Sequence, residues 1–210
     1  MRILVTAGPT REYIDSVRFV SNASSGRMGF AVAEAAAAAG HEVTLLAGPV
    51  ELAPPPGCRV VPFVSVEDLA GALGAHFADC DALVMTAAVG DFRPRRRVEG
   101  KIPRRGGAVT VRLVPTEDVL AGVARVKRPG QVVVAFAVED PPPAAAEAKA
   151  RAELAAKGAD LVVVNTPAAM GAEQSDACIL AAGRTILPWA MRSKRELAGE
   201  IIKLLVARSQ

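Results

Sequence analysis

Short runs of β-branched and other large apolar residues alternate with alanine-rich stretches along the chain, and this alternation constrains the fold more than any other feature. The apolar runs are uninterrupted, which is typical of strands that are buried on both faces. We expect strands at about residues 2–6, 43–47, 59–63, 82–86, 131–136 and 160–164, and helices at about 27–39, 66–78, 116–126, 143–157 and 192–207. This order predicts an α/β fold of the Rossmann-like, doubly wound type, with a mainly parallel sheet of about six strands.

Three connections are too long to be simple turns. The first runs from Ala7 to about Gly26. The second, at about residues 87–115, includes an alternating run from Thr110 to Val114 and predicts a small antiparallel flap. The third, at about residues 166–188, should contain a hairpin closed at Ala182-Gly183-Arg184. Because neither a repeat nor a linker divides the sequence, we expect a single domain over residues 1–210.

The composition argues against several classes of protein. The chain has three cysteines without C-x-x-C spacing and two isolated histidines, so a disulfide framework, a zinc site or a histidine base is not expected. It has no apolar run long enough to span a bilayer and no signal peptide at its start. We therefore expect a cytoplasmic location and no membrane partner.

Seven cations fall within thirteen residues of the second connection: Arg93, Arg95, Arg96, Arg97, Lys101, Arg104 and Arg105. The run could be a solvated loop or a nucleic-acid patch. Only Phe92 provides an aromatic ring nearby and no nucleic-acid fold motif accompanies the run, so no nucleic-acid partner is expected. A basic loop that closes over a phosphorylated substrate explains the charges equally well.

The residues between the first expected strand and the first expected helix indicate a nucleotide site of an unusual kind. Gly8 stands alone after the first strand, whereas a dinucleotide fingerprint would need G-x-G-x-x-G directly between strand and helix. This departure argues against a nicotinamide-dependent reductase. The turn from Ser24 to Gly29 (S-S-G-R-M-G) could cradle a phosphate at a helix N-terminus, or Ser24 or Ser25 could simply cap that helix.

Several blocks together closely resemble the signature of phosphopantothenate–cysteine ligases, the ligase half of the bacterial bifunctional coenzyme A biosynthesis protein. They occur in the family's order and cover nearly the whole chain. The blocks are T-A-G-P-T-R-E from Thr6, D-S-V-R-F-V-S-N-A-S-S-G-R-M-G from Asp15, A-A-V-G-D-F from Ala87, Lys101-Ile102, L-V-P-T-E-D-V-L from Leu113, A-F-A-V-E from Ala135 and D-L-V-V-V-N from Asp160.

The resemblance implies a reaction in coenzyme A biosynthesis. Family members join 4′-phosphopantothenate to L-cysteine after a nucleoside triphosphate has activated the carboxylate as an acyl-nucleotidyl anhydride. CTP serves in typical bacterial members and ATP in eukaryotic ones, so CTP with Mg²⁺ is the first expectation here, with metal ligands that the sequence does not indicate. The flavin-dependent decarboxylase belongs to the other half of the fused protein, so no FMN is expected on this chain.

The resemblance also assigns roles to individual positions. Gly8, Ser24, Ser25, Gly26, Gly29, Phe136, Lys157 and Asn165 match nucleotide-binding positions. Asn22 matches the asparagine that contacts the activated carboxylate, and Lys101 matches a catalytic lysine on a mobile flap. Ala87, Ala88 and Asp91 match the turn that binds phosphopantothenate. Arg18 matches an arginine that grips the substrate phosphate of the neighbouring subunit, which implies a homodimer with a shared active site.

Other interpretations stay open beside this one. Asp91 could cap a turn, Phe136 could be core, and Lys101 could be one solvated charge among seven. Pro103-Arg104-Arg105 stands where family flaps carry lysines, and Glu153 occupies a usual lysine position, with Lys149 as a possible substitute. These departures keep a non-catalytic nucleotide-binding relative as an alternative. A reductase is a weaker one, because Tyr13, the single tyrosine, is followed by no lysine at a useful spacing.

Overall fold

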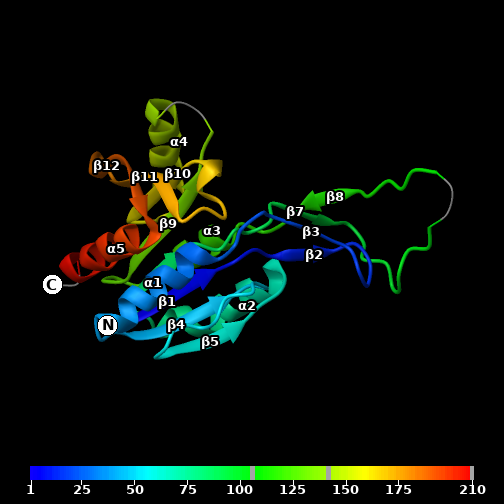
Figure 1. Cartoon of the computed structure of the whole chain (residues 1–210), viewed down its shortest axis with the longest axis horizontal. Coiled ribbons are helices and arrows are strands. Elements are labelled where there is room, and N and C mark those ends of the chain that lie inside the picture. Colours follow the sequence, from blue (N-terminus) through cyan, green and yellow to red (C-terminus); the bar gives the residue numbers. More distant parts are fainter. Residues whose placement is uncertain (105–106, 141–142, 209–210) are drawn as a thin grey trace.

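The computed structural model describes residues 1–104, 107–140 and 143–208. Its main sheet has eight strands in the order β12-β11-β10-β9-β6-β1-β4-β5 (Figure 1). The six strands from β10 to β5 run parallel to one another. In chain order the eight strands are β1 Arg2–Ala7, β4 Glu42–Ala47, β5 Cys58–Pro62, β6 Ala82–Met85, β9 Val132–Val138, β10 Leu161–Asn165, β11 Gln174–Ala181 and β12 Arg184–Ser193. The predicted α/β fold with a mainly parallel sheet is confirmed.

Helices cover both faces of this sheet (Figure 1). One apolar core joins alternate residues of the strands, such as Ile3 and Val5, to α1 (Arg27–Ala38) and α5 (Lys194–Arg208). The other joins the intervening residues, such as Leu4, to α2 (Val66–His76), α3 (Val119–Val126) and α4 (Pro143–Ala156). Side chains of a strand alternate between faces, so both sides of β1 must be apolar. None of the described helices is long and apolar enough to cross a membrane.

The sheet has eight strands rather than about six because the predicted hairpin joins it. β11 pairs antiparallel with β10, and β12 pairs antiparallel with β11. The turn lies at Ala182-Gly183, as expected, with Gly183 at φ 75°. β12 continues to Ser193, beyond the expected end of this region at residue 188, and α5 therefore begins at Lys194 rather than at residue 192. Helix α3 likewise begins three residues later than residue 116, because Asp118 caps it.

Two small hairpins project from the sheet as an extended arm (Figure 1). The first pairs β2 (Arg11–Tyr13) with β3 (Phe19–Ser21), and the second pairs β7 (Phe92–Pro94) with β8 (Leu113–Pro115). We call residues 11–21 and 92–115 the arm. The second hairpin is the predicted antiparallel flap, although its strand covers 113–115 rather than 110–114; Arg105 lies outside the described residues. The first hairpin was not predicted.

Candidate active site

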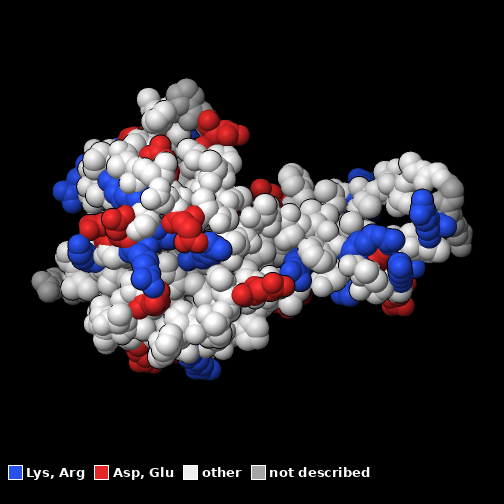
Figure 2. Space-filling view, viewed as in Figure 1, with Lys and Arg blue, Asp and Glu red and all other residues white. Residues whose placement is uncertain are grey.

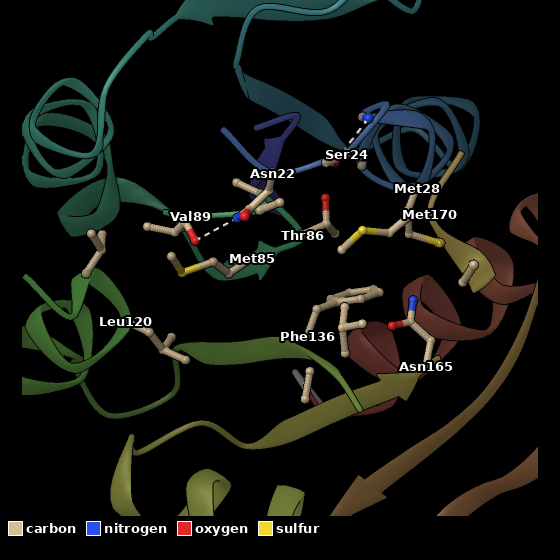
Figure 3. A pocket seen from close by; sticks show the side chains of 18 of the residues that line it. Asn22, Ser24, Met28, Met85, Thr86, Val89, Leu120, Phe136, Asn165 and Met170 are labelled. Carbon is tan, nitrogen blue, oxygen red and sulfur yellow. Dashed lines mark hydrogen bonds between the residues drawn. The ribbon is translucent and has the colours of Figure 1, made fainter. Parts of the chain in front are cut away.

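A cleft of 510 Å³ opens at the carboxyl ends of the parallel strands (Figure 3). Strand order reverses there between β1 and β6, since the chain adds β4 and β5 on one side and β9 and β10 on the other. Open α/β sheets bind ligands at such a switch point. Eleven of the predicted site residues line this cleft: Asn22, Ser24, Ser25, Gly26, Gly29, Ala87, Ala88, Asp91, Phe136, Lys157 and Asn165.

The turn into α1 presents an open helix N-terminus to the cleft. Gly26 is the N-cap residue, at φ 78°, and no side chain caps the helix. The Ser24 hydroxyl accepts only a long bond from the Gly26 N–H, at 3.4 Å, so the interpretation of Ser24 or Ser25 as a helix cap is wrong. In α2 and α3, by contrast, Ser65 and Asp118 cap the first turn. Uncapped N–H groups and the helix dipole make the start of α1 suited to an anion.

Glycines allow this turn to pack closely on the sheet. A Cβ on Gly29 would lie 2.4 Å from Thr86 Oγ1 and 2.5 Å from the Ala7 Cβ, so helix and strands could not approach as they do. Gly8 does not line the cleft; it lies beneath Gly26, whose added Cβ would be 3.4 Å from the Gly8 nitrogen. Gly8 thus supports the turn from below, at φ 83°.

Asn22 lies where the arm meets the cleft. Its Nδ2 donates to the Val89 carbonyl oxygen over 3.0 Å, which fixes the side chain against the turn after β6 (Figure 3). The amide nitrogen carries two hydrogens, so one remains for a ligand. The amide is therefore held in place and still able to donate.

The turn after β6 is tied to the end of β1. Thr86 Oγ1 donates to the Thr6 carbonyl at 2.5 Å, the Ala87 N–H donates to Thr6 Oγ1 at 3.0 Å, and the Ala88 N–H donates to the Gly8 carbonyl at 3.0 Å. The N–H groups of both alanines are therefore engaged within the protein. A substrate at this turn would find small side chains and the exposed carboxylate of Asp91 rather than free backbone donors.

The opposite end of the cleft combines an aromatic ring with polar groups. Phe136 and Asn165, from β9 and β10, lie beside Met28 and Met170 (Figure 3). Asn165 Oδ1 is buried and has no hydrogen-bond partner. A buried acceptor without a partner is costly, and a ligand with an N–H or O–H donor would satisfy it. Lys194, which also lines the cleft, is buried, and its ammonium donates to the Ala169 carbonyl at 2.9 Å.

Two lysines in and after α4 differ in whether they reach the cleft. Lys157 lines the cleft, and its Nζ lies 3.4 Å from Asp118 Oδ2. Glu153 lines the cleft as well. Lys149, the possible substitute, does not; its ammonium pairs with the buried carboxylate of Glu139 at 2.8 Å, and this contact raises the pKa of Lys149. In this conformation Lys149 therefore does not take the place of the cleft lysine that is missing at position 153.

The ionisable residues along the cleft have an acidic balance. Five carboxylates (Asp91, Glu117, Asp118, Glu139 and Glu153) line it with three cations (Arg27, Lys157 and Lys194). Within the described part of the chain, no group of three or more metal-ligating side chains is placed to hold a metal ion. A polyphosphate in this cleft would therefore need cations from elsewhere, since like charges repel.

The two remaining predicted residues, Arg18 and Lys101, do not line the cleft. Both are on the arm, where Figure 2 shows Lys and Arg side chains gathered. The Arg18 guanidinium binds the Asp15 carboxylate and donates to the Ile102 carbonyl oxygen over 3.3 Å. In this structure the arm projects away from the cleft (Figure 1).

Sequence reasoning missed several lining residues. Thr86, the last residue of an expected strand, could have been inferred from the rule that ligands bind at carboxyl ends of strands. Arg27 and Met28 lie inside the quoted S-S-G-R-M-G run but received no role. Lys194 and Met170 gave no signal, because they reach the cleft only through the packing of α5 and of the segment after β10.

A family model described as "DNA/pantothenate metabolism flavoprotein C-terminal domain" matches residues 1–208. The chain belongs to this family. The resemblance seen in the sequence blocks is thereby confirmed at the level of the family.

Named relatives of this flavoprotein C-terminal domain family extend the comparison. The chain is 42% identical to the Coenzyme A biosynthesis bifunctional protein CoaBC of Mycobacterium bovis over 222 residues, which cover 98% of this chain and 52% of that protein. It is 38% identical over 210 residues to a protein named Cysteine/Cysteine sulfinic acid decarboxylase, from an unknown prokaryotic organism, covering 98% of this chain and 58% of that protein. The chain thus spans about half the length of these curated relatives.

A solved structure matches the domain over nearly its full length. The crystal structure of the C-terminal domain of a CoaBC protein superposes with a TM-score of 0.82 at 35% identity, covering 97% of this chain and 93% of the other.

Proposed function

We propose that this domain joins 4′-phosphopantothenate to L-cysteine, with a nucleoside triphosphate, most readily CTP, as the activating co-substrate. The observation that carries the proposal is the cleft itself. It brings an uncapped helix N-terminus, a fixed Asn22 amide and an unpartnered Asn165 oxygen together at one switch point. The likeness to the C-terminal part of proteins named for coenzyme A biosynthesis supports the choice of reaction.

Two chemical steps fit this arrangement. First, a carboxylate oxygen of phosphopantothenate attacks the α-phosphorus of the nucleotide, and pyrophosphate leaves. Next, the amino nitrogen of cysteine attacks the acyl carbon, the nucleoside monophosphate leaves with the bonding electrons, and the amine loses a proton to solvent. Neither step needs a nucleophile from the protein, so the contribution of the cleft is to position the reactants and stabilise charge.

The residues of the cleft would share these tasks. The open N-terminus of α1 would bind the phosphates, with Gly8 supporting the turn beneath. Phe136 and Asn165 would hold the base and sugar at the far end. Asn22 would donate its free N–H to the acyl oxygen as negative charge grows there. Asp91, beside the small alanines, would accept a hydrogen bond from the pantothenate arm.

The acidic balance of the cleft bears on the metal. Mg²⁺ usually binds through substrate phosphates and one or two protein carboxylates, and Asp91, Glu117 and Asp118 offer such oxygens. Bound there, Mg²⁺ would neutralise part of the triphosphate charge. The remaining cations would come from Lys157 and from the arm.

The arm would bring two copies of the chain together. Seven large apolar side chains on the arm are at least a third exposed: Val17, Phe19, Phe92, Val98, Val109, Val111 and Leu113. Exposed apolar residues gathered on one feature mark an interaction surface, and a second copy of the chain is the occupant that the family resemblance implies. Arg18 and Lys101 would then reach the cleft of the partner subunit.

The test is a pyrophosphate-release assay with Mg²⁺, phosphopantothenate and cysteine, run with each of the four nucleoside triphosphates. We expect release that depends on both substrates and is fastest with CTP. Release of CO₂ from cysteine sulfinic acid should be followed in parallel, because one relative carries a decarboxylase name.

Two results would refute the proposal. CTP binding without turnover would identify a non-catalytic nucleotide-binding relative. Decarboxylation without pyrophosphate release would identify a different reaction altogether.

A further inference from the structure

Asp15 is a fully buried carboxylate on the arm, most of whose residues are exposed or half-buried. Its side chain has a relative exposure of 0%, compared with 47% for Arg18. Burying a carboxylate is unfavourable unless hydrogen bonds satisfy it, so the donors around Asp15 show what the burial achieves.

The donors come from two segments that are far apart in the sequence. Asp15 Oδ1 accepts from the Val17 N–H at 2.8 Å and from the Arg18 N–H at 2.7 Å. Asp15 Oδ2 accepts from the Ile102 N–H at 3.1 Å and also from the Arg18 guanidinium. These backbone bonds hold the pKa of Asp15 well below its usual range, against the opposing effect of burial. The carboxylate therefore stays charged and keeps all four donors.

Further bonds lay the two segments side by side. The Val98 N–H donates to the Ile14 carbonyl at 2.9 Å, the Ser16 N–H donates to the Gly100 carbonyl at 3.3 Å, and the Arg18 guanidinium donates to the Ile102 carbonyl at 3.3 Å. Lys101 lies between two residues that are bonded in this way. Its backbone is consequently fixed relative to Arg18.

We propose that Asp15 is a positioning residue that holds Arg18 and Lys101 as one cationic unit, so that both act on the same cleft, the one in the partner subunit. The inference rests on the proposed ligase function and its dimer. It adds that Lys101 does not move independently of the segment that carries Arg18. The unit would supply the positive charge that the acidic cleft lacks.

Mixed dimers distinguish this arrangement from independent action. Two differently tagged chains are co-expressed and purified through both tags, so that each dimer contains one copy of each variant. Combining Asn22→Ala with Arg18→Ala, or Asn22→Ala with Lys101→Ala, should leave one complete cleft and restore about half the wild-type rate. Combining Arg18→Ala with Lys101→Ala should restore nothing, because each cleft then lacks one cation. Restoration in this last pair would overturn the proposal.

A second experiment does not depend on turnover. In Asp15→Asn, which keeps the shape but removes the charge, hydrogen exchange at residues 98–102 should accelerate together with exchange at residues 16–18. Unchanged exchange at residues 98–102 would contradict the inference even if the ligase assay succeeded. Failure of the assay in the wild-type chain would instead count against the proposed function.

A kinetic measurement separates positioning from general loss of structure. Asp15→Asn should raise the KM for phosphopantothenate on the order of tenfold, as expected when a charge-assisted contact is lost. The matched control is Asp68→Asn. Asp68 also accepts backbone N–H groups, from Ser65 at 2.8 Å and Val64 at 3.2 Å, but it lies at the start of α2. Its loss should leave that KM unchanged, and an equal rise in both variants would sink the assignment.

Discussion

Asn22 is the residue for which we propose the most direct role in the second chemical step. Its amide donates one hydrogen bond to the Val89 carbonyl and keeps a second N–H, which we propose donates to the acyl oxygen of the substrate. We expect Asn22→Ala and the isosteric Asn22→Asp to reduce kcat for product about 10²- to 10³-fold, as removal of one oxyanion donor does. Because only the second step is affected, the acyl-nucleotidyl anhydride should accumulate after pyrophosphate release, and mass spectrometry of quenched reactions detects it. Full activity in either variant would refute this role.

The three cysteines should differ sharply in reactivity. Burial raises the pKa of Cys80 to about 11 and that of Cys178 to about 12, and it raises the pKa of the partly exposed Cys58 as well. A raised pKa keeps a thiol protonated, and the thiolate is the reactive form. Iodoacetamide at pH 8 should therefore label only Cys58, slowly, in the folded protein and all three cysteines in denaturant, as read by mass spectrometry. Labelling of Cys178 in the folded protein would contradict this burial.

Cleft residues could be predicted where the neighbouring sequence identifies them, and could not be predicted where distant packing brings them to the cleft. The site residues predicted between Asn22 and Gly29 and between Ala87 and Asp91 lie in short segments that come after a strand, and all of these predicted residues line the cleft. Lys194 could not be predicted, because it reaches the cleft by the docking of α5. The residue types of Arg18 and Lys101 indicate phosphate binding, but the sequence does not indicate where these residues lie, because their location depends on how the arm folds.

At the scale of elements, the crossing of α1 over β1 and β6 depends on Gly29. We expect Gly29→Ala to destabilise the fold by about 1–3 kcal/mol, because an added methyl group would overlap Thr86 and Ala7. Urea unfolding measures the difference. Gly71→Ala in α2 is the control: its added Cβ meets nothing within 4 Å, so the change should stabilise by up to about 1 kcal/mol. Equal effects of the two substitutions would argue against the close approach.

Strands with long apolar runs could be predicted, and shorter ones could not. All six expected strands form within a few residues of their expected bounds. Five of them are largely buried between the helices on both faces, whereas β5, at the edge of the sheet, has no buried residue. The hairpin of β2 and β3 was missed, since strands of three residues are too short to show alternation. Its position depends on contacts with the second hairpin, which lies some eighty residues away in the sequence.

At the scale of the molecule, the proposed association of two copies through the arm can be tested by the oligomeric state of arm variants. Val109→Asp combined with Val98→Asp should convert a dimer to a monomer, because both side chains are exposed on the arm and charges resist burial in an interface. Sedimentation velocity measures this. Val126→Asp, at the end of α3, is the control, since Val126 is also 66% exposed but lies off the arm. A dimer that persists in the double variant would place the interface elsewhere.

The two outer strands of the main sheet are poorly suited to pair with a strand of another chain. β12 carries Pro188, and the Arg192 guanidinium folds back to donate to the carbonyls of Pro188 and Ala177. The opposite outer strand, β5, is five residues long and ends in Pro62. Proline cannot donate to a neighbouring strand, and short or charged edges resist further pairing. Concentrated protein should therefore resist growth into ordered β-aggregates, because neither end of the sheet offers a template to an incoming chain.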